Sequence, residues 1–403
     1  MNVLIADKFE ESGLRALRDA GCEITYDAAL KEDTLRDAIA KTRCSILIVR
    51  STRVTSEMIR ASGDLSLIIR AGAGYNTIDV AAASARSVAV ANCPGKNAVA
   101  VAELAFALIL ALDRRVVDNT DDLRAGRWNK KEYAKARGLK GRTLGVIGVG
   151  QIGAAVIRRA LAFEMKVAAY SRSLTPERAA KLGVDYCKDP GDVAERCDIL
   201  SIHLAATPET KGIINAGVLG RLSPGSMVIN TSRADVLDYD ALKTAVKEQN
   251  LRVGLDVYPG EPATGKADFT ADIVKAGGIV YGTHHIGAST DQAQSAIAGE
   301  AVRIATTYAT TGEVHNCVNI QTKSPAKVQM IIRHYNKVGV LSGVLDEISH
   351  AGINVEEMSN TMYEGRECAV AAILLDDRPD EAVVARIAEK KDKIIKVEVK
   401  PIE

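Results

Sequence analysis

Three residues suited to proton transfer and anion binding each follow an apolar, strand-like run in the second half of the chain: Arg233, Glu261 and His285. Parallel strands bring their carboxyl ends to one edge of a sheet, where open α/β sheets bind ligands. A histidine beside a carboxylate is a tunable acid and base, and an arginine can bind a carboxylate and polarise the adjacent carbonyl. Any one of them alone would be interpreted as a surface or core residue. Together on one edge, they are predicted to be catalytic.

A glycine-rich turn lies upstream of these residues, in the stretch 144–153 (Leu-Gly-Val-Ile-Gly-Val-Gly-Gln-Ile-Gly). An apolar strand, the glycines and an alanine-rich helical pattern follow one another in the order of a dinucleotide-binding fingerprint. Gly148 permits the tight turn, Gly150 lets the backbone approach a pyrophosphate, and Gly153 lets helix and strand pack closely. The first amide groups of the helix would face the phosphates. The residues predicted to contact the cofactor are Gly148, Gly150, Gln151, Ile152, Gly153, Ser171, Arg172, His203, Thr231, Ser232 and Asp256.

The choice between NAD and NADP depends on the end of the next predicted strand, 167–170. An acidic residue at this place normally binds the ribose hydroxyls of NAD. This chain has Ser171 followed by Arg172. The missing carboxylate removes repulsion of a 2′-phosphate, and Arg172 could pair with one, which favours NADP slightly. The alternative is a solvent-facing loop that accepts either cofactor.

Composition excludes several classes of protein. The chain has 403 residues and a formal net charge of +1, so neither nucleic acid nor a membrane surface is an expected partner. The longest nearly apolar run, 98–112, is too short to span a bilayer, and the N-terminus lacks the basic flank of a secretory signal. The seven cysteines are scattered without a C-x-x-C pair, which indicates reduced thiols in a cytoplasmic protein and no metal site.

The spacing of apolar runs predicts the elements that position these residues. Up to about residue 95, strand-like and helical runs alternate, as in a parallel α/β sheet. One long helix is predicted from 97 to about 123, and the dinucleotide domain follows it. After a polar linker at 318–325, the tail has a β-α-β-β-α-β pattern, which is typical of a ferredoxin-like domain. The predicted fold class is therefore two Rossmann-like, doubly wound parallel-sheet domains plus a small ferredoxin-like C-terminal domain.

Over nearly its whole length, the chain resembles the D-2-hydroxyacid dehydrogenase family. Stretches 148–153, 230–233, 255–262 and 285–290 each match family motifs. The resemblance implies that the arginine, glutamate and histidine of these motifs are catalytic, and the Ile-Gly that follows the histidine pair assigns this role to His285. It also implies a discontinuous substrate domain. The domains expected are then 1–95 with 287–318 for substrate, 96–286 for the dinucleotide, and 326–403 for regulation.

The resemblance extends to the substrate. Residues 49–55 resemble a segment that binds a substrate phosphate, with Arg50, Ser51 and Arg53 as candidates, although solvated surface arginines are the alternative. Residues 70–76 resemble the glycine loop whose backbone holds the substrate carboxylate. The candidates there are Ala73 and Gly74, and Asn97 before the long helix is a further one.

The tail resembles an ACT regulatory domain. Its segments 334–341 and 352–355 match those that bind L-serine in feedback-inhibited family members. His334, Asn336 and Asn354 fall on the contact positions, and their amide and imidazole groups suit an amino acid. A purely structural dimerisation module is the alternative, and either interpretation is consistent with a homodimer or homotetramer.

The activity that the resemblance implies is NAD(P)-dependent oxidation of 3-phosphoglycerate to 3-phosphohydroxypyruvate, the first step of serine biosynthesis. A glyoxylate or hydroxypyruvate reductase that uses NADPH is the nearer alternative. A binding protein that senses a dinucleotide without catalysis is the other. The three catalytic residue types argue against it, because a sensor has no need of them.

Overall fold

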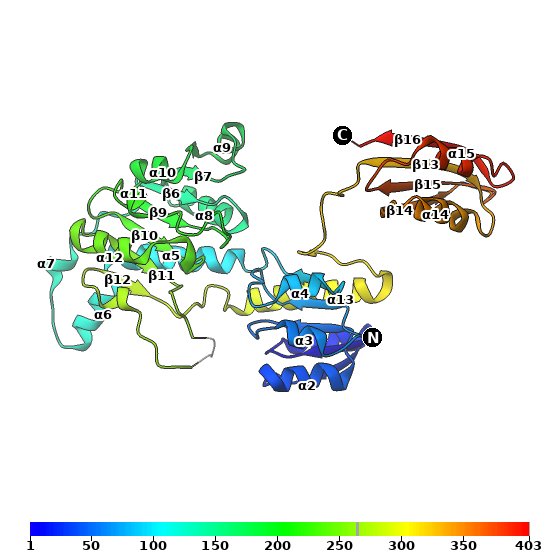
Figure 1. The fold of residues 1–403 in the computed structure, drawn as a ribbon. Helices are drawn as coiled ribbons and strands as arrows, with labels where there is room; N and C mark the ends of the chain where they lie inside the picture. Colours follow the sequence, from blue (N-terminus) through cyan, green and yellow to red (C-terminus); the bar gives the residue numbers. More distant parts are fainter. Residues whose placement is uncertain (263–265, 403) are drawn as a thin grey trace. The chain divides into compact units, whose positions relative to one another are not determined.

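The computed structural model describes residues 1–262 and 266–402, so Glu403, the last residue of the predicted C-terminal domain, lies outside the described residues. The chain forms two compact units, Met1–Asn319 and Ile320–Glu403. The first unit contains two parallel sheets and the second one antiparallel sheet, which confirms the predicted fold class (Figure 1). No helix within the described residues has the length and apolar character needed to cross a membrane.

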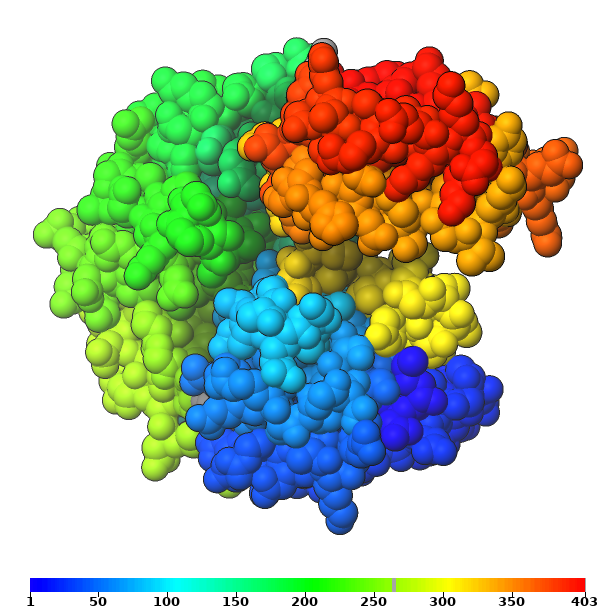
Figure 2. Space-filling view, turned by 45° about the vertical axis from the view of Figure 1, so that its right-hand side comes forward, coloured from blue at the N-terminus to red at the C-terminus, as the bar shows by residue number. Residues whose placement is uncertain are grey.

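The first lobe of the larger unit is a five-stranded parallel sheet in the order β2-β1-β3-β4-β5. Its elements are β1 (Asn2–Ile5), α1 (Glu11–Asp19), β2 (Glu23–Tyr26), α2 (Glu32–Thr42), β3 (Ile46–Val49), α3 (Ser56–Arg60), β4 (Leu67–Arg70), α4 (Val80–Ser84) and β5 (Ala89–Asn92). The late helix α13 (Asp291–Thr311) packs against α1, and its Ile297 and Ile304 share a core with Ile5. Figures 1 and 2 show this yellow helix beside the blue first lobe.

The second lobe is a seven-stranded parallel sheet in the order β12-β11-β10-β9-β6-β7-β8. Its strands are β6 (Thr143–Ile147), β7 (Lys166–Tyr170), β8 (Asp185–Tyr186), β9 (Ile199–Ile202), β10 (Met227–Asn230), β11 (Arg252–Leu255) and β12 (Val280–Gly282). Its helices are α8 (Gln151–Ala162), α9 (Pro176–Leu182), α10 (Pro190–Arg196), α11 (Ala216–Leu219) and α12 (Tyr239–Glu248), with short 3₁₀ turns η1 (Ala234–Val236) and η2 (Asp272–Lys275). Strands β9 and β10 are completely buried, as expected of inner strands in a parallel sheet that is covered on both faces.

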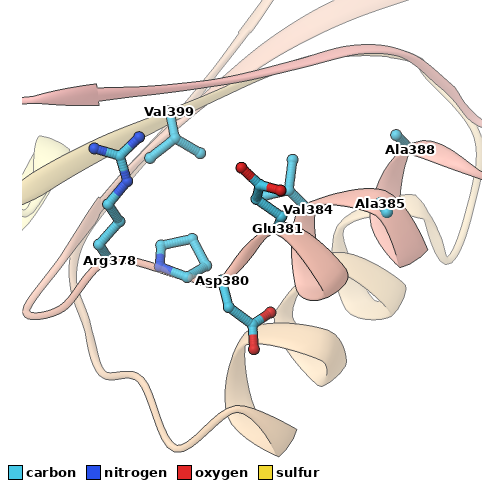
Figure 3. Close-up of a pocket in the computed structure, with 8 residues that line it drawn as sticks. Arg378, Asp380, Glu381, Val384, Ala385, Ala388 and Val399 are labelled. Atoms are coloured by element: carbon cyan, nitrogen blue, oxygen red, sulfur yellow. The ribbon is translucent and has the colours of Figure 1, made fainter.

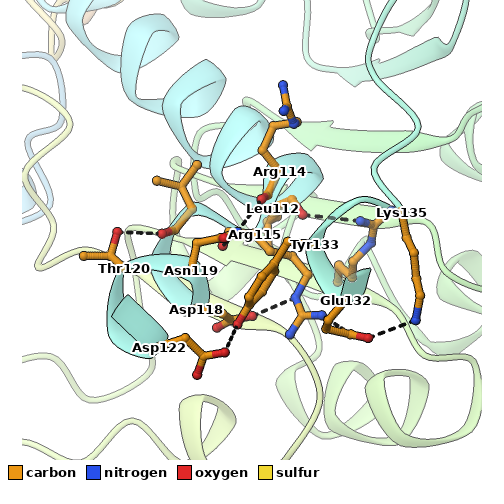
Figure 4. Close-up of polar contacts among 12 residues, drawn as sticks. Leu112, Arg114, Arg115, Asp118, Asn119, Thr120, Asp122, Glu132, Tyr133 and Lys135 are labelled. Carbon is orange, nitrogen blue, oxygen red and sulfur yellow. Dashed lines mark hydrogen bonds and ion pairs between the residues drawn. The ribbon is translucent and has the colours of Figure 1, made fainter. Parts of the chain in front are cut away.

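The single long helix predicted from residue 97 to about 123 is wrong. The structure has α5 (Ala98–Arg114) and α6 (Val116–Arg124), separated by Arg115 in the left-handed conformation at φ +50°. The Arg115 guanidinium is bound by Asp118 and Glu132 and lies 5.0 Å from the centre of the Tyr133 ring (Figure 4). These contacts offset the cost of the left-handed backbone at Arg115. Helix α6 and the short α7 (Lys130–Tyr133) contain no buried residue.

The C-terminal unit is an antiparallel sheet in the order β14-β15-β13-β16, covered by two helices. Its elements are β13 (Val328–Tyr335), α14 (Val340–His350), β14 (Val355–Met362), β15 (Cys368–Leu375), α15 (Glu381–Ala388) and β16 (Ile394–Pro401). This is the β-α-β-β-α-β order that the sequence predicts. The core includes Met330, Ile332, Val344 and Ile373 and belongs to this unit alone, so the domain has an interior of its own.

Candidate active site

The glycine turn after β6 has the geometry that a dinucleotide fingerprint requires. Gly148 has φ +96°, and a Cβ on it would lie 2.3 Å from the carbonyl oxygen of His203. A Cβ on Gly153 would lie 1.9 Å from the carbonyl oxygen of Gly148, so α8 can approach the turn only with glycine there. A Cβ on Gly150 would meet no described protein atom within 4 Å. The side of the turn at Gly150 is therefore open, as close approach by a ligand requires.

Two buried polar atoms near this turn support the presence of a ligand there. The Nδ1 atom of His203 and the Oγ1 atom of Thr231 have no hydrogen-bond partner among the described residues. Buried polar groups are normally paired, so an orphaned one calls for an explanation such as a ligand. Burial lowers the pKa of His203 to about 4, and its Nε2 lies 2.8 Å from Ser201 Oγ, so the buried imidazole is neutral. These residues fit a bound dinucleotide.

The remaining predicted cofactor residues lie around the same turn. Gln151 and Ile152 begin α8, and the Gln151 amide occupies the space where a Cβ of Gly95 would lie, so this helix meets the loop that leads into α5. Ser171 is half-buried and Arg172 exposed, directly after β7. Ser232 is buried and donates its hydroxyl to Asn230.

Arg233 is presented by a loop that the buried Asn230 side chain organises. At the end of β10, Asn230 Oδ1 accepts hydrogen bonds from the Ser232 amide (3.0 Å) and hydroxyl (2.8 Å). Its Nδ2 donates to the Arg233 carbonyl at 2.9 Å, so both polar atoms of the side chain are hydrogen-bonded. The Arg233 guanidinium extends to the first lobe, where a Cβ on Gly74 would lie 2.2 Å from its Nη2. The predicted catalytic arginine therefore meets the predicted substrate loop.

Glu261 and His285 form a direct pair. Glu261 Oε2 lies 2.5 Å from His285 Nδ1, and its Oε1 accepts the Tyr258 amide at 2.6 Å. Gly260, at φ +70°, provides the turn that folds the carboxylate back onto that amide. The neighbouring His284 is exposed and has no such contact among the described residues. Since Glu261 uses Nδ1, the His285 Nε2 is the ring nitrogen that remains for a substrate.

Asp256 at the end of β11 organises the histidine loop. It is 1 % exposed. Its Oδ1 accepts the Ile286 amide (2.8 Å) and the Thr283 hydroxyl (2.6 Å), and its Oδ2 accepts the Gly287 amide (2.9 Å). These bonds hold His285 at φ +52°, a conformation that costs energy for a non-glycine residue and clusters at functional sites. The predicted contact between Asp256 and a cofactor stays a prediction.

The electrostatics of the pair favour a charged glutamate. Burial raises the pKa of Glu261, but the hydrogen bonds from His285 and from the Tyr258 amide outweigh burial, and the net shift is downward. Burial lowers the pKa of Arg233, and the nearby Glu261 opposes that shift. An ionised carboxylate that orients an imidazole can stabilise the imidazolium formed when the ring takes a proton.

On the first lobe, the half-buried Asp7 shapes the predicted substrate segment. The Asp7 carboxylate after β1 accepts the amides of Arg50 (2.7 Å), Ser51 (3.1 Å) and Thr52 (3.0 Å). The Ser51 hydroxyl also donates to Asp7, and Arg53 is exposed. Asp7 therefore fixes the loop that carries the predicted phosphate-binding residues.

The glycine loop is held in the same way. Asn92 at the end of β5 donates its Nδ2 to the Ala73 carbonyl at 2.6 Å. Asn97 is close in sequence, and its Oδ1 is buried without a partner among the described residues. Ala73, Gly74 and Asn97 thus lie on segments that lead to one edge of the sheet.

Sequence reasoning missed three residues that position the others: Asp7, Asn92 and Asn230. Asn92 and Asn230 end apolar strands, and Asp7 lies two residues after one. That placement was the available signal, because a polar residue at the carboxyl end of a buried parallel strand must find a partner in the loops there.

The three predicted effector residues do not meet within one copy of the chain. His334 is 2 % exposed, and its ring contacts the Tyr335 carbonyl and Asn360 Oδ1. Asn336 donates to the Arg366 carbonyl at 2.9 Å. In the sheet, His334 lies opposite Ala369 of β15. Asn354 directly precedes the first residue of β14, which lies opposite Leu375 of β15. Ala369 and Leu375 are about 20 Å apart along the strand, so Asn354 is far from His334.

A groove on the C-terminal unit lies elsewhere, beside α15 and Val399 of β16. Arg378, Asp380 and Glu381 line its polar end, as Figure 3 shows. None of the predicted effector residues lines this groove. Within residues 1–262 and 266–402, no cluster of His, Cys, Asp and Glu could hold a metal ion.

Comparison with known proteins agrees with this geometry. Residues 106–287 match the family described as D-isomer specific 2-hydroxyacid dehydrogenase, NAD binding domain. The chain is 32% identical to a D-3-phosphoglycerate dehydrogenase of Methanocaldococcus jannaschii over 91% of this chain and 68% of that protein. It is 38% identical to a hydroxypyruvate reductase of Thermotoga maritima over 68% of this chain and 87% of that protein.

A solved structure also shows similarity to a dehydrogenase of this kind. The NAD⁺-bound 3-phosphoglycerate dehydrogenase of Entamoeba histolytica matches with a TM-score of 0.66 and 27% identity, over 79% of this chain and 99% of that one. The chain spans about two thirds of the length of the curated D-3-phosphoglycerate dehydrogenases that it matches. The glycine fingerprint, the Glu261–His285 pair and the relatives thus point to the same family. The chain belongs to the D-isomer specific 2-hydroxyacid dehydrogenase family of NAD-dependent oxidoreductases.

Proposed function

We propose that the protein oxidises 3-phosphoglycerate to 3-phosphohydroxypyruvate. The observation that carries this proposal is the Glu261–His285 pair at the same sheet edge as Arg233, whose guanidinium contacts the Gly74 loop. An acid and base, an anion-binding group and a dinucleotide turn are the parts that hydride transfer at a 2-hydroxy acid needs. The relatives named D-3-phosphoglycerate dehydrogenase support the choice of substrate.

Each residue has a role that follows from its contacts. His285 Nε2 takes the proton of the C2 hydroxyl in oxidation and returns it in reduction, while Glu261 stabilises the charged ring through Nδ1. Arg233 binds the carboxylate and polarises the developing carbonyl. The backbone amides of the Ala73–Gly74 loop hold the carboxylate from the other side. A bound nicotinamide dinucleotide supplies the hydride acceptor.

The phosphate is assigned to Arg50 and Arg53, on the loop that Asp7 organises. A substrate panel tests this assignment: 3-phosphoglycerate, glycerate and lactate, each with NAD and with NADP. We expect turnover of 3-phosphoglycerate to exceed that of the two unphosphorylated acids. Equal rates with all three acids would contradict the proposal.

A hydroxypyruvate or glyoxylate reductase is the second candidate. The relative from Thermotoga maritima and the pair Ser171-Arg172 favour it. R53M separates the candidates, because loss of this cation should weaken only a phosphorylated substrate. An unchanged rate with 3-phosphohydroxypyruvate would favour the second candidate.

For the cofactor, we propose a slight preference for NADP over NAD. Ser171 offers no carboxylate to repel a 2′-phosphate, and Arg172 is exposed beside it. The comparison of kcat/KM with the two cofactors tests this. A much higher kcat/KM with NAD than with NADP would contradict the proposal. In that case, R172A should leave kcat/KM unchanged with both cofactors.

The C-terminal unit is proposed to be an ACT regulatory domain that binds L-serine. His334 and Asn336 lie far from Asn354 within one copy, so a serine site built from all three needs residues of two copies. Calorimetric titration with L-serine tests binding. No heat at millimolar serine and no inhibition would contradict the effector role.

We also propose that the protein is a homodimer or homotetramer, with domain boundaries at 1–95 with 287–318, 96–286 and 326–403. The arm formed by α6 and α7 supports association, because none of the residues in these two helices is buried and Leu123 and Trp128 are 60% and 82% exposed. Large apolar side chains left in water commonly mark an interface. Sedimentation of a Leu123→Asp variant tests this, and an unchanged oligomer would exclude the arm.

A further inference from the structure

A buried tyrosine reaches the loop that carries the candidate carboxylate. Tyr239 is the first residue of α12 and is 8% exposed. The Asp238 side chain caps this helix by accepting two backbone amides, so the start of α12 is fixed. The Tyr239 hydroxyl donates a hydrogen bond to the Val257 carbonyl at 2.5 Å. A residue at a fixed helix end is therefore tied to the loop 256–261.

This hydrogen bond acts on one peptide unit, the one that joins Val257 and Tyr258. The carbonyl of this unit accepts the Tyr239 hydroxyl, and its amide donates to Glu261 Oε1 at 2.6 Å. The peptide is trans, so its carbonyl and amide lie in one rigid plane and point in opposite directions. Fixing the carbonyl therefore also fixes the direction from which the amide holds Glu261.

The contacts form one continuous chain of hydrogen bonds. It runs from the Tyr239 hydroxyl through the 257–258 peptide to the Glu261 carboxylate, whose Oε2 lies 2.5 Å from His285 Nδ1. Hydrogen bonds in such a chain polarise one another. Val257 is 1% exposed, and no other described residue donates to its carbonyl. Without the hydroxyl, this carbonyl would be buried and unpaired, which folded proteins avoid.

The surroundings keep the Tyr239 hydroxyl a neutral donor. Burial raises the pKa of Tyr239, the nearby Tyr258 and Glu261 raise it further, and the Asn230 amide opposes the rise. Asn230 is also the residue that organises the Arg233 loop. One phenol thus lies near the support of the candidate arginine and near that of the candidate glutamate.

We propose that Tyr239 is a positioning residue for the Glu261–His285 pair. Through the 257–258 peptide it holds the Glu261 carboxylate in the orientation that keeps the proton on Nδ1 of His285 and leaves Nε2 for the substrate. Its effect on turnover rests on the proposed function. Its effect on the orientation of the pair can be tested without turnover.

The kinetic test is Y239F, which removes one hydroxyl and keeps the ring. We expect kcat for oxidation of 3-phosphoglycerate to fall about 3- to 30-fold, the cost of leaving one buried carbonyl unpaired. KM should stay within about twofold, because no substrate contact is lost. The matched control is Y281F on β12, since Tyr281 is also 8% exposed and its hydroxyl lies near Asp118 of α6. Equal kcat values in Y239F and Y281F would overturn the proposal.

Nitrogen NMR of the six histidines gives a readout that does not depend on turnover. In protein with ¹⁵N-labelled, neutral imidazoles, the resonances that disappear in H285A belong to His285. In the wild type and Y281F, Nδ1 of this ring should carry the proton and Nε2 none. In Y239F the two chemical shifts should move towards each other, because a loosened carboxylate no longer selects one tautomer. Unchanged His285 resonances in Y239F, even with a lower melting temperature, would show that the hydroxyl supports only the fold.

The positioning role and the proposed function fail in different ways. If the wild type does not oxidise 3-phosphoglycerate, the proposed function fails, but the tautomer change in Y239F still supports the positioning role. If Y239F does not fold, Y239H replaces it, because its shorter ring cannot reach the Val257 carbonyl. A Y239H protein with the kcat and the His285 resonances of the wild type would contradict the proposal.

Discussion

The two sheet edges that meet at the candidate site differ in how their charges are satisfied. On the second lobe, Glu261 and His285 are paired, and the buried Asn230 and Asp256 use almost every polar atom to shape the loops. On the first lobe, Arg50 and Arg70 have no carboxylate partner among the described residues. Under the proposed function, this difference means that the second lobe is preorganised for proton transfer, whereas the first takes its counter-charges from the substrate.

The largest expected effect concerns the paired edge. H285A should lower kcat by about 10²- to 10⁴-fold, the contribution of a positioned acid and base, while dinucleotide binding is kept. The adjacent His284 provides the control, since it is exposed and has no described contact with Glu261. H284A should stay within a few-fold of the wild type in steady-state kinetics. A reversed order of the two variants would assign the chemistry to His284.

The support beneath that edge is tested by D256A. This change leaves the amides of Ile286 and Gly287 without their acceptor. We expect a loss of about 2–4 kcal/mol in the free energy of unfolding, because unsatisfied buried donors keep their full desolvation cost. Urea unfolding measures the loss. Turnover should fall as well, since the His285 loop is no longer fixed, and wild-type stability would show that water replaces the carboxylate.

Two glycines of the fingerprint separate binding from folding. G150A puts its methyl group where no described protein atom lies within 4 Å, so the melting temperature should be unchanged, while dinucleotide affinity falls about 10- to 100-fold. G153A drives a methyl group into the Gly148 carbonyl, so it should lower the melting temperature. Fluorescence titration and thermal unfolding on both variants check this contrast. Equal thermal effects would contradict it.

The smallest expected effect lies at the joint between the two lobes. Glu300 on α13 binds Arg303, Lys96 and Asn316. The Arg303 hydrogen bond lowers the pKa of Glu300 most, burial opposes it, and Lys96 and Asn316 add to it, giving about 2 against an ordinary 4.5. The folded-state pKa is the lower one, so the stabilisation is complete above about pH 4.5 and disappears as pH falls towards 2.

E300Q should therefore unfold about 1–2 kcal/mol more easily than the wild type at pH 7. The difference should shrink as the pH is lowered from 5 towards 2, because the wild-type carboxylate becomes protonated. Urea unfolding at several pH values measures it. A difference that is constant with pH would mean that the charge of Glu300 has no part in it.

Much of the fold was predictable because parallel strands have a strong sequence signal. The apolar runs 46–49 and 67–69 lie in strands β3 and β4, in the predicted alternation of strands and helices, since a covered strand needs only continuous apolar residues. The polar edge strand β2 and the two-residue β8 escaped prediction, because neither has such a run. The break at Arg115 depends on Asp118 and Glu132, a tertiary arrangement that helical periodicity does not register.

The same limit applies to the site. The motif residues Arg233, Glu261 and His285 were predictable from their types and from their places after strands. The pairing of Glu261 with Nδ1 of His285, and the approach of the Arg233 guanidinium to the Gly74 loop, depend on distances between segments that are remote in sequence. In the C-terminal unit, the motif positions were predictable, but the sheet register alone shows that Asn354 lies far from His334.

The most direct test of the central claim is steady-state reduction of NAD or NADP by the wild type with 3-phosphoglycerate, run beside H285A and with glycerate as the unphosphorylated comparison. The account predicts turnover by the wild type, a clear preference for the phosphorylated acid, and a loss of at least about 10²-fold in H285A. Turnover that survives in H285A, or an equal rate with glycerate, would contradict it.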